Sequence, residues 1–131
     1  MRDILFKGKR KDNGKWVYGN YAVADNNGKQ QYFIFQNKAF EFEVDPETVG
    51  QYTGLTDKNG KKIFEGDILR VAYHPEQDVI IEWSDGSFRF RRANNPKDCV
   101  YSTIRYMQNA MSGLKIVGNI HDNPELLEVK E

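Results

Sequence analysis

Short runs of alternating hydrophobic and polar residues, separated by turn signals, dominate this chain of 131 residues. Asn-Gly and Asp-Gly dipeptides interrupt the runs, and such dipeptides readily adopt the positive φ angles that a tight hairpin turn requires. Because strand-forming residues flank each dipeptide, the pattern predicts a series of antiparallel hairpins. The dipeptides are Asn13-Gly14, Asn27-Gly28, Asn59-Gly60 and Asp85-Gly86.

The clearest predicted hairpin covers residues 79–92 and turns at Asp85-Gly86. Two of its cross-strand pairs are apolar and share one face, which we expect in the core. A third pair joins opposite charges on the other face and is favourable. These pairs are Trp83 with Phe88, Ile81 with Phe90, and Glu82 with Arg89.

A second predicted hairpin turns at Asn27-Gly28 and contains the most apolar strand of the chain, residues 32–35. Both faces of this strand are hydrophobic, so we expect it to be covered on both sides or to pack on another subunit. The expected cross-strand pairs are Val23 with Tyr32, Ala22 with Phe33, and Tyr21 with Ile34.

The remaining signals predict further short strands and very little helix. One short helix is expected over residues 102–112, and Asn123-Pro124-Glu125 favours a single helical turn near the end of the chain. We expect an N-terminal β lobe over residues 1–60 and a second lobe over residues 61–131. The other predicted strands cover residues 15–19, 51–55, 62–64, 68–73 and 114–120.

Composition narrows the setting of the protein. The 19 basic and 19 acidic residues cancel, which argues against a protein that coats nucleic acid but permits a local basic patch. Cys99 is the only cysteine, so no internal disulfide can form, as is usual in a reducing cytoplasm. Neither a signal peptide nor a membrane span is recognisable. We therefore expect a cytoplasmic protein without a membrane partner.

Catalytic and ligand-binding motifs are missing from the sequence. The loop over residues 54–62 has the wrong spacing for a phosphate-binding loop and no Ser or Thr for magnesium. A calcium loop starting at Asp57 lacks its later oxygen ligands, and Pro75 interrupts a possible metal-binding face around His74. We expect no enzyme, no cofactor and no metal site. The carboxylates Asp45, Glu65 and Asp67 are expected to form turn and cap hydrogen bonds.

Three stretches of the chain together resemble the YopX family of phage and prophage proteins. The resemblance implies a mainly β protein with an SH3-like β-barrel in its C-terminal half, encoded by a phage, a prophage or another mobile element. It implies no activity, so it transfers no catalytic residue to this chain. The predicted strands over residues 61–131 would suit such a barrel. The three stretches are residues 14–19, residues 44–55 with 57–69, and residues 117–127.

The leading functional hypothesis is a non-enzymatic binding or assembly module of phage or prophage origin. An apolar strand and an apolar tail are its candidate contact sites. The partner would be a phage protein, a host protein or a second copy of this chain. The candidate contact residues are Tyr32, Phe33, Phe35, Leu126 and Leu127.

The alternative hypothesis is a regulatory protein that binds nucleic acid through two basic clusters. Aromatic residues accompany both clusters, as in proteins that stack bases on a basic strand face. It is less favoured because Phe88 and Phe90 are expected in the core and Glu82 is expected to neutralise Arg89. The candidate residues are Lys7, Lys9, Arg10, Lys11, Lys15, Arg89, Arg91 and Arg92.

Overall fold

The turns predicted from the sequence are the points at which the chain reverses direction. In the computed structural model, Gly28 and Gly86 have φ angles of 85° and 84°. Asn27 has a φ of 54°, so the Asn27-Gly28 pair has the two left-handed residues of a type I′ turn. This turn type matches the right-handed twist of the strands that it joins, which explains why the hairpins form where the dipeptides occur.

The structure describes residues 5–37, 39–71, 74–84, 86–93, 99–101 and 114–127. Strands form most of these ranges, and the helical segments within them are two short 3₁₀ turns. The prediction of a mainly β protein is therefore confirmed. The chain divides into two compact units, Met1–Tyr52 and Thr53–Glu131. The boundary predicted at residue 60 falls in the turn between β5 (Gly50–Thr56) and β6 (Lys62–Phe64).

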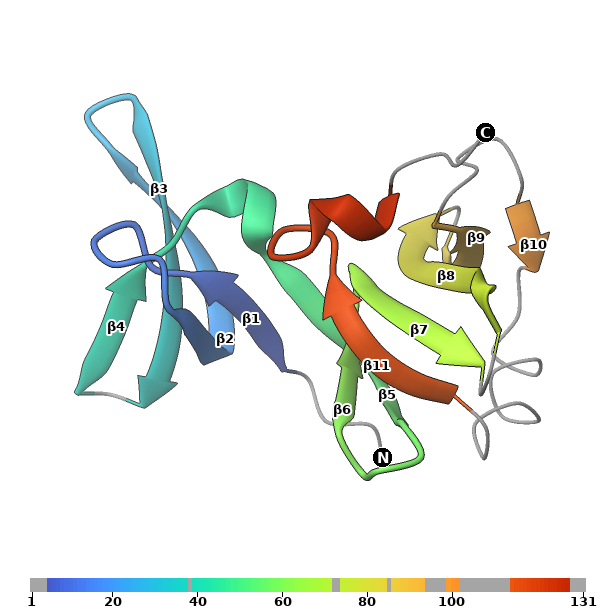
Figure 1. Ribbon diagram of the computed structural model, residues 1–131. Coiled ribbons are helices and arrows are strands. Elements are labelled where there is room, and N and C mark those ends of the chain that lie inside the picture. The colour runs from blue at the N-terminus through green and yellow to red at the C-terminus, as the bar shows by residue number, and fades with distance from the viewer. Residues whose placement is uncertain are drawn as a thin grey trace. The chain divides into compact units, whose positions relative to one another are not determined.

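The first unit is a curled antiparallel sheet (Figure 1). Its strands follow the order β4-β3-β2-β1-β5, and β5 continues past Tyr52 to neighbour β6. An isolated bridge between Arg10 and Val44 brings the end of β1 beside the end of β4. The new elements are β1 (Phe6–Lys9), β2 (Trp16–Asn26), β3 (Lys29–Asn37), β4 (Phe40–Glu43) and the 3₁₀ turn η1 (Pro46–Thr48).

The inner face of this curled sheet holds the core of the first unit. Val17, Ile34 and Val44 are buried there. The three cross-strand pairs predicted around Asn27-Gly28 all form between β2 and β3, so that register is confirmed. Half-buried side chains complete the core: Phe6, Tyr21, Tyr32, Phe42 and Val49.

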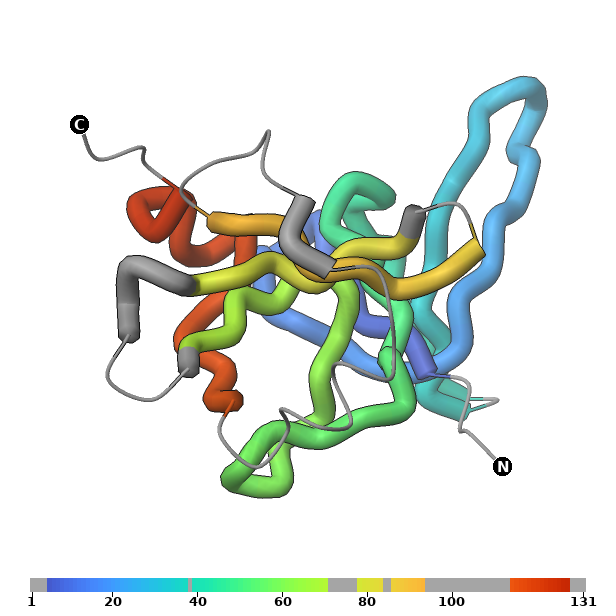
Figure 2. The backbone as a smooth tube through the Cα atoms, turned by 90° about the vertical axis from the view of Figure 1, so that its right-hand side faces the viewer, coloured from blue at the N-terminus to red at the C-terminus, as the bar shows by residue number. Residues whose placement is uncertain are grey.

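The second unit is built on a separate antiparallel sheet with the order β10-β9-β8-β7-β11. All three pairs predicted for the hairpin over residues 79–92 form between β8 and β9, so this register is also confirmed. Figure 2 shows the path of these strands from the side. The elements are β7 (Asp67–Val71), β8 (His74–Ser84), β9 (Ser87–Arg92), β10 (Cys99–Tyr101), β11 (Leu114–Asn119) and the 3₁₀ turn η3 (Pro124–Leu127). The buried core residues are Ile63, Leu69, Val79, Ile81, Phe88, Phe90 and Leu114.

One expectation for this hairpin needs correction. Trp83 was expected in the core, but 48% of its surface is exposed, although its ring meets Phe88 edge-on at 4.8 Å between centroids. The described pairing of β7 with β8 stops at Ile80, so Trp83 extends beyond it. Glu82 lies opposite Arg89 as predicted, and it also forms an ion pair with Arg91, its diagonal neighbour.

The other predictions for the second unit have mixed outcomes. Pro124–Leu127 form the predicted helical turn. The SH3-like barrel is not confirmed, because neither sheet closes within the described ranges. The helix predicted over residues 102–112 lies outside the described residues.

Candidate binding surface

The outer face of the first unit carries four aromatic side chains. They occupy alternate positions of β2 and β3. Their side chains point to the side of the sheet opposite to that of Val17 and Ile34, which face the core. Tyr18 is 47% exposed, and the other three are half-buried. We call this surface the outer aromatic face, and its residues are Trp16, Tyr18, Phe33 and Phe35.

The two phenylalanines of this face have small or polar cross-strand neighbours on β2, which do not cover their rings. Phe33 lies opposite Ala22, and Phe35 lies opposite Asn20. The two phenylalanine rings tilt against each other at 44°, with their centroids 6.2 Å apart. Together they form a continuous apolar ridge along β3 on the side of the sheet that faces away from the core.

Lysine side chains from β1 lie on the tryptophan at one end of this face. Lys9 is directly opposite Trp16, and Lys7 is opposite Tyr18. Their Nζ atoms lie 4.4 Å (Lys7) and 5.4 Å (Lys9) from the centroid of the Trp16 ring, within range of cation–π attraction. Lys7 is buried as a result. These two cations therefore interact within the protein.

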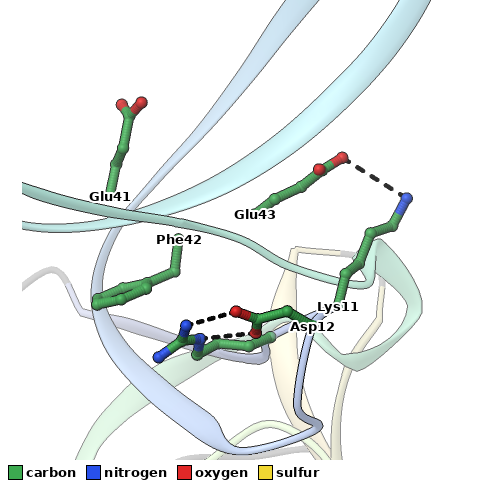
Figure 3. A pocket seen from close by; sticks show the side chains of 6 residues that line it. Lys11, Asp12, Glu41, Phe42 and Glu43 are labelled. Carbon is green, nitrogen blue, oxygen red and sulfur yellow. Dashed lines mark hydrogen bonds and ion pairs between the residues drawn. The ribbon is translucent and has the colours of Figure 1, made fainter.

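A shallow hollow of about 300 Å³ lies where the end of β1 meets β4 (Figure 3). The Arg10 guanidinium donates two hydrogen bonds to Asp12, with N–O distances of 2.9 and 2.5 Å, and lies 4.4 Å from the centroid of Phe42. The hydrogen bond from Arg10 lowers the pKa of Asp12. Lys11 pairs with Glu43 at 3.6 Å.

The charges of this hollow therefore largely compensate one another. Glu41 lies on the opposite side of β4 from Phe42 and is exposed (Figure 3). A hollow with paired charges and a half-buried ring offers no concentrated field for an ionic ligand. Its arrangement is better suited to holding β1 and β4 together than to catalysis.

The structure separates the residues predicted to contact a partner. Phe33 and Phe35 lie together on the outer aromatic face. Tyr32 points to the inner face, where its ring stacks on Tyr21 at 6.4 Å between centroids and its hydroxyl donates to Gln30. The remaining two, Leu126 and Leu127, are half-buried in η3 of the second unit.

The predicted basic clusters also belong to different units. Lys7 through Lys15 belong to the first, and Lys15 itself is exposed beside the turn, where its backbone N–H donates to Asn13 Oδ1 at 2.9 Å. Arg89, Arg91 and Arg92 are half-buried on β9 of the second unit, where Arg91 pairs with Glu82.

Carboxylates in the family-like stretches have structural roles. Asp45 accepts a hydrogen bond from the backbone N–H of Glu47 at 3.0 Å and caps η1. Asp67 is buried and accepts from the backbone N–H of Phe64 at 2.8 Å. The cap and turn roles predicted for these two residues are confirmed.

Asp57 is a buried carboxylate that accepts three backbone hydrogen bonds, and the sequence did not single out this role. It is buried, and it accepts hydrogen bonds from the backbone N–H groups of Asn59 and Lys61 at 2.9 Å and of Ile116 at 3.1 Å. Burial alone would raise the pKa of Asp57, but these three bonds and the charge of Lys61 outweigh it and lower the pKa. Asp57 thereby ties the β5–β6 turn to β11.

Sequence reasoning placed Trp16 and Tyr18 in a predicted strand beside a basic cluster but did not count them among the contact residues, and it missed β4. The alternation Phe40-Glu41-Phe42-Glu43 is typical of a strand with one apolar face, and it could have revealed the hollow's wall. Among the residues that the structure describes, no three His, Cys, Asp or Glu side chains gather closely enough to hold a metal. The same ranges contain no helix long and apolar enough to span a membrane.

Two antiparallel sheets, with helix limited to single turns in the described ranges, define the class of this protein as mainly β. Residues 5–128 match the family described as YopX protein, so the chain belongs to the YopX family. Its fold is similar to the crystal structure of protein EF1440 from Enterococcus faecalis. That likeness covers 98% of this chain and 100% of the other, with a TM-score of 0.58 and 24% identity, and it shows the fold alone. No curated protein matches the sequence.

Proposed function

We propose that this protein is a non-enzymatic module that binds a protein partner through the outer aromatic face. One observation carries the proposal: aromatic side chains lie on a sheet face whose opposite side already forms the core. An exposed aromatic patch of this kind typically marks an interaction site. Aromatic residues are enriched in protein interfaces because they bury a large area with few rotatable bonds.

A protein partner is favoured over nucleic acid by the state of the cations. Lys7 and Lys9 lie on the Trp16 ring. Their side chains therefore cover a ring on which a base could otherwise stack. Two carboxylates flank the phenylalanines, because Glu43 lies opposite Phe33 and Glu41 opposite Phe35. Glu43 is paired with Lys11, but the exposed Glu41 would repel a phosphate beside Phe35, whereas it would not repel a polypeptide with an apolar surface.

Membership of the YopX family supports the proposal that the gene comes from a phage or prophage and that the module acts inside the bacterial host. We also propose that the second unit is an SH3-like barrel in which the β5–β6 turn covers the edge of β11. The contacts that support this are the Asp57 bond to Ile116 and the bond from the Lys58 backbone N–H to the Leu114 carbonyl at 2.9 Å.

Site-specific photocrosslinking in host cells tests the binding proposal. A benzophenone amino acid is placed at Phe35 and, as a control, at Lys58, which is exposed in the second unit. We expect a recurrent protein adduct at position 35 that is absent at position 58. Adducts identified by mass spectrometry at both positions alike, or nucleic acid recovered at position 35, would contradict the proposal.

Substitutions on the outer aromatic face provide a second test of the binding proposal. Threonine retains strand propensity, so replacing both Phe33 and Phe35 by Thr removes the ridge but keeps the strand. We expect the partner recovered above to lose at least ten-fold in affinity for this variant. The matched control is Phe40→Thr, which removes a 55% exposed ring on the other side of the sheet and should leave binding unchanged.

A further inference from the structure

Within the residues that the structure describes, one backbone edge of the first unit has no neighbouring strand. β1 pairs with β2 only from Trp16 to Gly19. Beyond Gly19, β2 continues to Asn26 with β3 on one side, and within the described ranges no strand lies on the other. The end of this hairpin extends beyond β1 and β4 in both views of the chain (Figures 1 and 2).

The register determines which backbone groups face this edge. Asn26 and Lys29 flank a two-residue turn, so they exchange both hydrogen bonds with each other. Hydrogen-bonded and non-bonded pairs then alternate along the strand. The residues of β2 that direct their N–H and C=O groups away from β3 are therefore Tyr21, Val23 and Asp25, which we call the open edge.

The open edge lacks the features that usually prevent sheet edges from pairing. Residues 20–25 contain no Pro and no Lys, and the register with β3 runs without a bulge. Val23, at its centre, is 50% exposed. Asp25 carries the only charge, and its Oδ1 already accepts the backbone N–H of Gly28 at 2.9 Å. A strand of matching length would find unpaired donors and acceptors and an apolar side chain.

We propose that two copies of this chain pair antiparallel through their open edges, about a two-fold axis at Val23. In that register Val23 faces the second copy's Val23, and each Tyr21 faces Asp25. All three outward residues then find partners, whereas a two-residue shift toward the start of β2 would require Gly19, which already pairs with β1. The tyrosine hydroxyl can donate to the carboxylate, and no like charges oppose each other.

The overall charge of the chain also permits this pairing. With 19 basic and 19 acidic residues, two copies meet without net repulsion. An antiparallel pair of identical edges is isologous, so the assembly closes as a dimer and does not propagate into a fibre. The pairing uses a backbone edge, not the outer aromatic face, so each proposal can fail while the other holds.

Thiol crosslinking at the two-fold axis tests the register. In a Cys99→Ser background, Val23→Cys places two thiols opposite each other, with Cα atoms about 5.5 Å apart in a hydrogen-bonded pair. A short bis-maleimide should then produce a covalent dimer at least ten times faster than with Gln30→Cys, an exposed position on the other strand of the hairpin. Equal rates for the two variants would overturn the proposal.

Sedimentation equilibrium tests the dimer without a crosslinker. Val23→Lys places two like charges at the axis and should weaken dimerisation at least ten-fold, whereas Val23→Thr should leave it within three-fold. Unchanged circular dichroism and melting confirm that both variants fold. A native chain that remains monomeric at 100 µM would overturn the proposal, as would a Val23→Lys variant that dimerises like the native chain. Photocrosslinking at Phe35 in the Val23→Lys chain reports on the proposed function separately.

Discussion

The two predicted hairpins, β2–β3 and β8–β9, follow the same local rules and have different surroundings. Each begins with a strand of 11 residues, and each turns at a glycine with φ near 85°. Val23 and Ile81 stand at equivalent positions, four residues before the turn. Val23 is 50% exposed and Ile81 is fully buried.

Neighbouring strands account for this difference. β7 pairs with the far side of β8 through Ile68 and Leu69, and the face of Ile81 packs into the core of the second unit. The corresponding length of β2 has β3 alone beside it among the described strands. Similar two-residue turns therefore specify pairing within each hairpin, while burial depends on elements that lie far away in sequence.

The largest expected effect comes from a core ring of β9. Phe90→Ala should lower the free energy of unfolding of the second unit by about 3–5 kcal/mol, because Phe90 is buried and its loss leaves a cavity. Val23→Ala, in the exposed hairpin, should change stability by less than about 0.5 kcal/mol. Urea denaturation followed by Trp83 fluorescence in a Trp16→Phe background measures the effect of Phe90→Ala. Trp16 fluorescence in a Trp83→Phe background measures the effect of Val23→Ala. Similar losses in the two hairpins would contradict the comparison.

Removing the Asp57 carboxylate should weaken the second unit by about 2 kcal/mol, since hydrogen bonds to a charged acceptor contribute about 1.5–3 kcal/mol. Asp57→Asn keeps one acceptor oxygen but cannot accept on the other side from Ile116. Asp25→Asn is the control, because its exposed carboxylate bonds one amide, that of Gly28, in the β2–β3 hairpin. Equal losses in the two variants would argue against a special role for Asp57.

The same variant predicts a pH dependence. The pKa of Asp57 is lowered in the folded protein, so its stabilising contribution is present above the unfolded pKa of about 3.9. That contribution is lost as pH falls through the lower folded pKa. Stability curves of the native chain and of Asp57→Asn should therefore differ most above pH 4 and converge in stronger acid. Parallel curves throughout would contradict the assignment.

Breaking the ion pair between β7 and β8 should cost about 1.5 kcal/mol, between the values for exposed and buried pairs, because the Arg70 side chain is one-third exposed. Arg70 donates two hydrogen bonds of 2.8 Å to Asp78, whose side chain is 7% exposed, so Arg70→Met leaves a buried carboxylate unpaired. The Arg10–Asp12 pair has similar geometry, but Asp12 is 63% exposed. Asp12→Asn should therefore leave the urea midpoint of the first unit unchanged within error. A comparable shift of the urea midpoint in Asp12→Asn would show that side-chain exposure does not determine how much each ion pair contributes to stability.

The smallest expected effect is the same in both hairpins. Gly28→Ala and Gly86→Ala should each destabilise their own unit by roughly 1 kcal/mol, because alanine is strained at a φ near 85°. A Cβ at either position meets no neighbouring atom within 4 Å, so only the backbone contributes. Thermal unfolding of each unit, followed by its own tryptophan, checks the equality. A markedly larger loss at one turn would show that tertiary contacts reach it.

Pairing registers could be predicted from the sequence because a two-residue turn leaves only one way to align the strands on either side of it. The candidate site could be predicted only in part. Phe33 and Phe35 were identified from a strand with two apolar faces, but the alternation alone did not reveal that Tyr32 points inward. The contact between Arg10 and Phe42 joins residues more than thirty positions apart, and no local pattern indicates such a contact.

The sequence by itself determined the turns, the hairpin registers and which side chains share a face, since these depend on steric preferences within a few residues. Only the tertiary structure decided which faces are covered and which edges remain open. Asp57 reaches Ile116 across 59 positions, and β7 covers β8 while β1 stops short on β2. Burial and edge protection are non-local, because they depend on where the rest of the chain packs, and they turn two similar hairpins into a core element and a candidate binding arm.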